Sequence, residues 1–357
     1  MAWRVEYPQI WFTVGPQCKD AKTIEGLLRA GATGARLAFS YGTHQTQIER
    51  NRLLRNIAAS LGRSILLIAD LQGEKCRLAR FMDSHDRQVD KVAVYATRPF
   101  TITKHLEDAS VSADKLVLPV QVSTFIDNLD VGDTIVYGDG ELLLTVLKKH
   151  PEMVTCSVNR DGFVNPGRGF VVRSSTFRPA SITLKDQHDL EFICSSGAFD
   201  AVALSFVASV SDVEYARTIM KASGCMLPII AKIETEIGIH NIDEVAKASD
   251  GVMAARGDLA LTTPWEELPA FMNEIARAAR SHKTPWILAT QLVSGLEQFE
   301  FPTRPEICDL AQWMSQDALG AMLSYETAFG PRPIEAVEAV NKIISRYKRS
   351  SPPIWKH

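Results

Sequence analysis

Eight short apolar runs, separated by segments of helical periodicity, limit the fold of this sequence more than any other feature. Short buried strands that alternate with amphipathic helices are typical of βα units in a parallel sheet. Eight such units in a chain of 357 residues predict an α/β fold, the TIM barrel. The predicted strands are Ile10–Val14, Gly34–Phe39, Ser64–Ala69, Ala201–Phe206, Pro228–Ile233, Gly251–Ala255, Trp286–Ala289 and Gly320–Leu323.

The third unit is interrupted directly after Asp70. For about a hundred residues the βα rhythm is replaced by strand-like alternation and by turn sequences such as Gly138-Asp139-Gly140. This pattern predicts an inserted antiparallel β-barrel that serves as a lid on the TIM barrel. The predicted domains are a barrel of residues 1–72 and 179–357 and a lid of residues 73–178.

Composition and charge exclude several classes of protein. Hydrophobic residues make up 46% of the chain, enough for a sizeable core, and the net charge of −3 argues against a nucleic-acid partner. The six cysteines are widely spaced and contain no CxxC pair, as expected for reduced thiols. No apolar run approaches the roughly 20 residues that span a bilayer. We therefore expect a cytoplasmic protein without membrane or nucleic-acid partners.

Polar side chains occur at the ends of most predicted strands, where a purely structural barrel would carry Val, Ile or Leu. In a TIM barrel these positions converge on one mouth, which is where active sites lie. The residues are Arg36, Ser40, Asp70, Lys232, Glu234, Arg256, Asp258, Thr290, Ser324 and Glu326. Their joint occurrence predicts an active site at this mouth.

Lys232 and Glu234 are two residues apart, so both side chains lie on one face of a strand. Together with Asp258 they offer two carboxylates beside an ammonium group. Magnesium is usually held by one or two carboxylates and by substrate oxygens, and a nearby lysine can neutralise a phosphoryl group in transfer. A buried Lys–Glu ion pair with no catalytic role is the alternative.

Motifs along essentially the whole chain resemble the pyruvate kinase family in their order and spacing. They include Thr13-Val14-Gly15-Pro16, Gly34-Ala35-Arg36-Leu37-Ala38-Phe39-Ser40-Tyr41-Gly42, Ile230-Ala231-Lys232-Ile233-Glu234, Ala255-Arg256-Gly257-Asp258-Leu259, Ala289-Thr290-Gln291, Pro302-Thr303-Arg304 and Met322-Leu323-Ser324-Tyr325-Glu326. The resemblance implies transfer of a phosphoryl group from phosphoenolpyruvate to ADP, which yields pyruvate and ATP. The sequence ends at His357, without the C-terminal regulatory domain that the family usually carries.

The resemblance also implies roles for individual residues. Lys232, Arg36, Thr290 and Lys75 would be catalytic, and Glu234 and Asp258 would bind Mg²⁺ or Mn²⁺. Substrate would be bound by Ala255, Arg256, Gly257, Asp258 and Thr290, and nucleotide by Arg36, Tyr41, Asp139 and Arg168. A homodimer formed through the barrel is left open.

One departure from the family pattern concerns potassium. The family's strand-3 motif carries Glu where this chain has Lys75, and its strand-2 motif carries Asn where this chain has Ala38. The pair resembles the branch of the family that works without potassium, with the Lys75 ammonium next to Asp70 in place of the ion. The alternative is that Lys75 points into solvent from the hinge of the lid.

Tyr325 and Ala260 stand where the family has glycine, so the sequence leaves the substrate open. A specialised paralogue could phosphorylate or dephosphorylate another enol or 2-hydroxy acid. A non-catalytic module could bind phosphoenolpyruvate or a nucleotide. A metal-dependent carbon–carbon lyase of similar shape is a further alternative, although it would not need a lid for a nucleotide.

Overall fold

The computed structural model describes residues 7–83, 87–112, 115–174 and 176–348. Two compact units divide the chain. The barrel unit comprises residues 1–73, 180–257 and 269–357, and the inserted unit comprises residues 74–179 and 258–268. The second piece of the inserted unit, residues 258–268, is one that the sequence did not assign to it.

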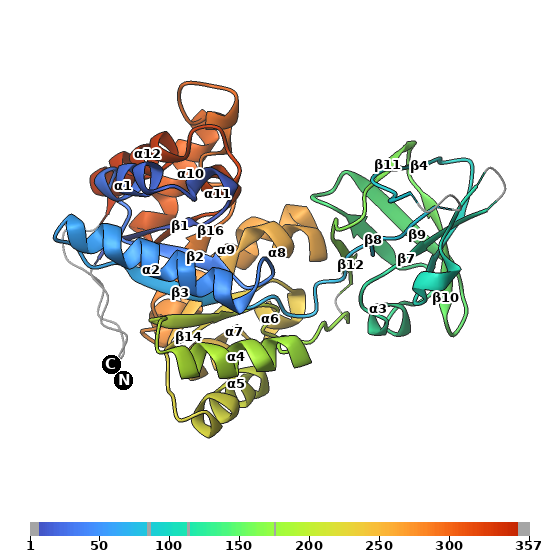
Figure 1. The fold of residues 1–357 in the computed structure, drawn as a ribbon, viewed down its shortest axis with the longest axis horizontal. Helices are drawn as coiled ribbons and strands as arrows, with labels where there is room; N and C mark the ends of the chain where they lie inside the picture. Colours follow the sequence, from blue (N-terminus) through green and yellow to red (C-terminus); the bar gives the residue numbers. More distant parts are fainter. Residues whose placement is uncertain (1–6, 84–86, 113–114, 175, 349–357) are drawn as a thin grey trace. The chain divides into compact units, whose positions relative to one another are not determined.

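Eight parallel strands close the barrel unit (Figure 1), as predicted. Their order around the barrel is β1, β17, β16, β15, β14, β13, β3 and β2. The bounds are β1 Gln9–Thr13, β2 Gly34–Ala38, β3 Leu66–Asp70, β13 Ala201–Leu204, β14 Ile229–Ile233, β15 Gly251–Ala255, β16 Trp286–Ala289 and β17 Gly320–Leu323.

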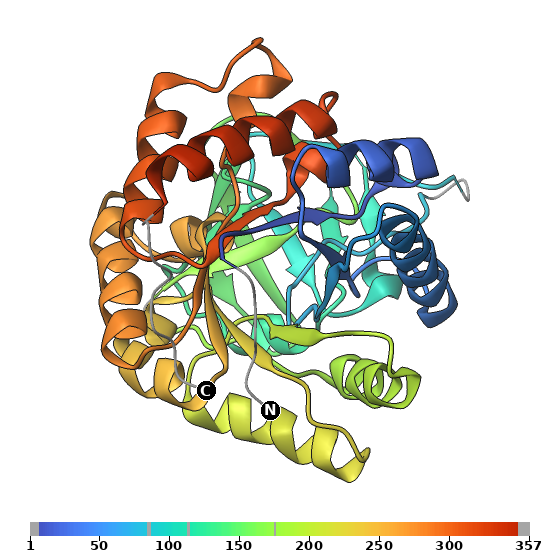
Figure 2. The same cartoon turned by 90° about the vertical axis from the view of Figure 1, so that its left-hand side faces the viewer.

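Helices form a ring around these strands (Figure 2). They are α1 Ala21–Arg29, α2 His44–Ser60, α4 Leu184–Ser196, α5 Val210–Ala222, α6 Glu236–His240, α7 Ile242–Ala248, α9 Leu268–Ser281, α10 Arg304–Ser315, α11 Tyr325–Ala328 and α12 Pro333–Tyr347. Helix α8, Arg256–Thr262, begins in the barrel unit and ends in the inserted unit. Short 3₁₀ turns occur at η1 Pro16–Cys18, η3 Trp265–Glu267 and η4 Ser294–Glu297.

Local hydrogen bonds fix the starts and ends of two helical segments. Asn241 ends α6 and begins α7, and its side chain donates to Ala208 O at 2.8 Å. Ser209 and Asp212 form the capping box of α5.

The interior of the barrel is filled by one indole ring together with alanine, isoleucine, leucine and methionine side chains. Trp11 is fully buried there, among alanines and methionines such as Ala203 and Met253. Gly34 on the neighbouring strand makes room for the indole, since a Cβ at this position would lie 2.3 Å from Trp11 Cδ1. The barrel is thus a packed core, as in other folds of this type.

The inserted unit contains a seven-stranded sheet in the order β12, β8, β9, β10, β5, β7 and β6. Its bounds are β5 Phe100–Thr103, β6 Ser110–Val111, β7 Leu116–Pro119, β8 Thr134–Tyr137, β9 Leu142–Lys149, β10 Met153–Val158 and β12 Phe170–Arg173, with β4 Val92–Val94 paired to β11 Gly162–Val164. Two short helical segments, η2 Leu106–Asp108 and α3 Thr124–Asp127, complete the unit.

A short segment, residues 76–79, lies between β12 and β7 and hydrogen-bonds to the chain on both sides. Phe170 N donates to Cys76 O at 2.9 Å on one side, and Ala79 N donates to Pro119 O at 2.8 Å on the other. The expectation of a wholly antiparallel barrel was wrong in one pairing, because β5 and β7 are parallel. The chain passes through η2 and β6 between them, so it returns in the same direction.

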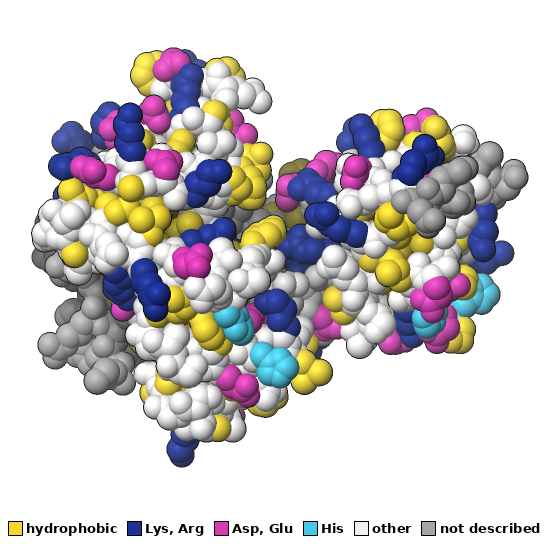
Figure 3. Space-filling view, viewed as in Figure 1, with side chains coloured by type: hydrophobic (Ala, Val, Ile, Leu, Met, Phe, Trp, Pro, Cys, Tyr) yellow, Lys and Arg dark blue, Asp and Glu magenta, His cyan; other side chains and the backbone are white. Residues whose placement is uncertain are grey.

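None of the helices in the described part of the chain is long and apolar enough to cross a membrane. On the face shown in Figure 3, acidic and basic side chains are interspersed. This distribution agrees with the small net charge.

Candidate functional site

Three charged side chains from three barrel strands meet at Asp70, the last residue of β3. Arg36 on β2 donates from Nε to Asp70 Oδ2, and Lys232 Nζ on β14 lies 3.3 Å from Asp70 Oδ1. The carboxylate is only 2% exposed, so both cations compensate its desolvation. The structure therefore brings together Arg36, Asp70 and Lys232, which the sequence had placed at separate strand ends.

The ionisation of Asp70 follows from these contacts. Burial by itself would raise the pKa of the carboxyl group, but the charges of Arg36 and Lys232 outweigh burial and hold the pKa below its ordinary value. Asp70 is therefore a carboxylate at neutral pH. It can orient the two cations without taking up a proton from either.

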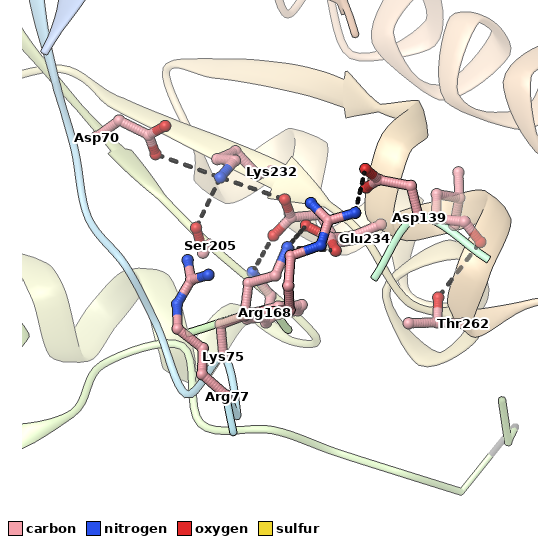
Figure 4. A network of polar contacts seen from close by, with 12 residues as sticks. Asp70, Lys75, Arg77, Asp139, Arg168, Ser205, Lys232, Glu234 and Thr262 are labelled. Carbon is pink, nitrogen blue, oxygen red and sulfur yellow. Dashed lines mark hydrogen bonds and ion pairs between the residues drawn. The ribbon is translucent and has the colours of Figure 1, made fainter. Parts of the chain in front are cut away.

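Lys232 is the best-anchored group of this cluster (Figure 4). Its Nζ is 2.7 Å from Ser205 Oγ, 3.2 Å from Glu234 Oε1 and 3.3 Å from Asp70 Oδ1. Ser205 Oγ accepts a hydrogen bond from the ammonium, and the two carboxylates form ion pairs with it. With its side chain 9% exposed, Lys232 is a fixed and largely desolvated positive charge.

Glu234 is held from the opposite side by the backbone. Its Oε2 accepts a hydrogen bond of 2.8 Å from Phe206 N, and the residue is 2% exposed. Phe206 has a φ of 52°, in the left-handed region that non-glycine residues seldom adopt. The hydrogen bond to the carboxylate thus comes from a residue with an unusual backbone conformation.

Ser205 is a site residue that sequence reasoning missed. It directly follows β13 and is 3% exposed. The predicted strand extended to Phe206, so Ser205 was counted as an interior residue of an apolar strand. The rule that located the other residues, a polar side chain directly after a buried strand, would have found it with the correct strand end.

A second part of the mouth is organised by Arg256, the first residue of α8. Its Nη2 donates to Thr290 O at 2.9 Å and to Gln291 O at 3.1 Å, and its Nη1 lies 2.5 Å from Asp309 Oδ2. Thr290 and Gln291 have φ values of 76° and 53°. The guanidinium thus holds the unusual backbone that follows β16.

Gly257 leaves room for the side chain of Thr290. A Cβ at position 257 would lie 2.9 Å from Thr290 Cγ2. The predicted substrate-binding residues Ala255, Arg256, Gly257 and Thr290 are therefore neighbours within the barrel unit. Their contact with a substrate stays a prediction.

Glu326, another polar residue of the predicted mouth, has a structural role. It is 3% exposed and accepts hydrogen bonds from Leu292 N at 2.7 Å and Ser324 N at 2.9 Å. A buried carboxylate that binds backbone amides ties the ends of β16 and β17 together.

In the inserted unit, Lys75 forms a bidentate ion pair with Asp258. Lys75 Nζ lies 2.7 Å from Asp258 Oδ1 and 3.0 Å from Oδ2, and the two side chains are 27% and 17% exposed. The alternative in which Lys75 merely points into solvent is wrong. Its predicted place next to Asp70 concerns the other unit and stays a prediction.

The predicted nucleotide-binding residues are divided between the two units. In the inserted unit, Arg168 Nη2 lies 3.4 Å from Asp139 Oδ2 and also contacts Glu141 (Figure 4). Asp139 is 76% exposed, so its carboxylate is open to solvent. In the barrel unit, Tyr41 is likewise exposed, beside the start of α2. Nucleotide binding by these groups stays a prediction.

The predicted ligands of a divalent cation are chemically suitable. Glu234 and Asp258 are both carboxylates with an oxygen facing a lysine, so each already lies where a positive charge is stabilised. Oxygen ligands of this kind fit Mg²⁺ or Mn²⁺. Among the residues that the structure describes, no group of three or more His, Cys, Asp or Glu side chains could hold a metal ion. A cation bound by either carboxylate would need further oxygens from substrate and water.

Comparison with known proteins identifies the family to which these features correspond. The family model for the barrel domain of pyruvate kinase matches residues 6–337. The pyruvate kinase of Thermococcus litoralis is 33% identical over 333 residues, which cover 93% of this chain and 67% of that protein. That of Mycobacterium intracellulare is 32% identical over 96% of this chain and 71% of its own length. Pyruvate kinase 2 of Synechocystis is 31% identical, and the match covers 56% of that protein.

Proposed function

Because this chain belongs to the pyruvate kinase family, we propose that it transfers a phosphoryl group from phosphoenolpyruvate to ADP, yielding pyruvate and ATP. The observation that carries the proposal is the anchored ammonium of Lys232. It is buried, it is fixed by Ser205, Asp70 and Glu234, and it stands at the carboxyl ends of the barrel strands. This is where TIM-barrel enzymes place their catalytic groups.

Phosphoryl transfer needs positioning and charge neutralisation more than covalent chemistry. In the transition state, negative charge is spread over the oxygens of the phosphoryl group. A preorganised ammonium in a site with little water stabilises that charge without having to rearrange. Lys232 would supply this charge and Arg36 a second one, with Asp70 keeping both side chains in place.

A divalent cation would be held by Glu234 and Asp258 together with substrate oxygens. When bound, such an ion supplies positive charge to phosphate and enol oxygens. Phe206 N, which donates to Glu234 Oε2, would keep the carboxylate oriented toward the ion. Turnover should then be abolished by a chelator and restored by Mg²⁺ or Mn²⁺.

The remaining roles are proposed from the family resemblance. Thr290 and the backbone amides of Ala255 to Asp258 would bind the enol and the carboxylate of the substrate. Arg36, Tyr41, Asp139 and Arg168 would bind the nucleotide. Lys75 would take the place of the potassium ion.

The test is a coupled assay of the purified protein with phosphoenolpyruvate, ADP and Mg²⁺, in which formation of pyruvate and of ATP is measured separately. We expect both products in equal amounts, and we expect neither when ADP is omitted. Pyruvate without ATP would indicate a phosphatase. Absence of both products from folded protein would contradict the proposal and favour a paralogue with another substrate.

A further inference from the structure

The turn after β13, Ser205 to Val207, contacts the end of β14 at three consecutive residues. Ser205 Oγ accepts from Lys232 Nζ at 2.7 Å, Phe206 N donates to Glu234 Oε2 at 2.8 Å, and Val207 N donates to Lys232 O at 3.2 Å. One short turn therefore fixes the backbone of Lys232, its ammonium group and the neighbouring carboxylate.

The orientation of the Ser205 hydroxyl is determined by its second partner. Ser205 Oγ donates to Leu71 O at 2.8 Å, and a carbonyl oxygen can only accept. The hydroxyl proton is thus committed to the loop after β3, and a lone pair is presented to Lys232. This arrangement suits an ammonium donor and would not suit a group that needs to accept.

The contact with Ser205 differs from the other two contacts of the ammonium group. It is the shortest of the three, and it adds no negative charge. Asp70 and Glu234 are ionic partners whose attraction for Lys232 changes when other charges enter the site. A neutral acceptor keeps its attraction for the nitrogen while charge moves around it.

We propose that Ser205 is a positioning residue for phosphoryl transfer, which holds the Lys232 ammonium in place through a neutral hydrogen bond. This inference rests on the proposed function of Lys232. Ser205 itself need not touch the substrate. Its loss should lower kcat more than it raises KM, because a displaced ammonium weakens the transition state more than the bound substrate.

The variant Ser205→Ala removes the acceptor and leaves the chain otherwise unchanged. We expect kcat to fall about 10- to 100-fold, the range for loss of a supporting hydrogen bond at a functional group, with KM for phosphoenolpyruvate changed about threefold or less. Ser205→Thr keeps the hydroxyl and should recover most of kcat. Ser205→Cys, whose sulfur is a weak acceptor, should resemble Ser205→Ala and tests the same point if the alanine variant does not fold.

Ser249→Ala is a matched control. Ser249 is 1% exposed and its Oγ donates to Val245 O at 2.6 Å, so it has the same kind of buried serine–carbonyl bond without a lysine partner. We expect a similar loss of thermal stability and no change in kcat. If Ser205→Ala behaves like this control, Ser205 is only a structural link between β13 and β3, and the inference is wrong.

A second measurement does not depend on activity. The rate at which an amine-acylating reagent modifies Lys232, followed by peptide mass spectrometry, should rise severalfold in Ser205→Ala and stay unchanged in Ser249→Ala. Unchanged labelling together with unchanged kcat would overturn the inference. If the native protein showed no phosphoryl transfer, the proposed function would fail, while the labelling result would still decide whether Ser205 holds Lys232.

Discussion

Replacement of Lys232 by methionine is the most direct test of the proposed chemistry. Methionine keeps the unbranched shape of the side chain up to Cε and removes the charged nitrogen, so the phosphoryl oxygens lose the ammonium that would neutralise them. We expect kcat to fall by about 10³-fold or more, which corresponds to about 4 kcal/mol of transition-state stabilisation. The coupled assay with phosphoenolpyruvate, ADP and Mg²⁺ measures this loss.

The same substitution should also destabilise the fold. Lys232 is a shared partner of Asp70 and Glu234, both about 2% exposed, and removing one partner from a buried ion pair typically costs about 3–5 kcal/mol. We expect the lower end, about 3 kcal/mol, because Asp70 keeps Arg36 and Glu234 keeps Phe206 N. Urea unfolding of both proteins measures the difference.

Activity must therefore be measured well below the unfolding temperature of the variant, so that lost kcat reports on chemistry. Lys221→Met, at the exposed end of α5, is the control for exchange of a lysine and should leave both kcat and stability nearly unchanged. A folded Lys232→Met protein that retains kcat within about tenfold of the native value would refute the argument.

Three further predictions concern other charged groups. If the Lys75 ammonium substitutes for potassium, initial rates should be indifferent to K⁺ at constant ionic strength, and Lys75→Glu should lower them; a requirement for millimolar K⁺ in the native protein would contradict this. Arg256→Lys should lower kcat/KM about tenfold or more, since a lysine ammonium cannot reproduce the planar guanidinium that binds Thr290 O, Gln291 O and the Asp309 carboxylate together. Arg217→Lys, whose guanidinium similarly binds Ala248 O and Asp250, should cost stability alone, and equal activity losses in both would refute the distinction. The pKa of Asp70 in the folded protein lies below its unfolded value of about 3.9, so the ionised carboxylate stabilises the fold above that pH, and this contribution is lost as pH falls through the folded pKa. Unfolding midpoints of the native protein and of Asp70→Asn, measured from pH 7 down to pH 2, should therefore converge. A gap that stays constant over this range would contradict the assignment.

Local patterns in the sequence were sufficient for the architecture of the barrel. Alternation of buried strands with helices is a property of neighbouring residues, so the eight strands were predicted within a few residues of their observed ends. A polar residue at the end of a strand can likewise be recognised from its immediate neighbours in the sequence. Once the fold is a TIM barrel, Arg36, Asp70, Lys232 and Glu234 must share one end of it.

The inserted unit shows where such patterns fail. The strands β4, β5, β6 and β11, of two to four residues each, were not predicted. The parallel pairing of β5 with β7 depends on the path of the chain between them, which hydropathy does not record. Which strands pair, and in which direction, is determined by the packing of the whole unit.

Polar residue types at strand ends and the family resemblance located the residues of the candidate site, but they did not assign the partners of these residues. Only the folded chain pairs Lys75 with Asp258, 183 residues away, Arg256 with Asp309, and Lys232 with Ser205 in the turn after β13. An ammonium or guanidinium group can donate to any properly placed oxygen, so its residue type does not select among the many oxygens of the chain. The choice is made by distances between strand ends and by left-handed turns such as that at Phe206, which exist only once the barrel has closed.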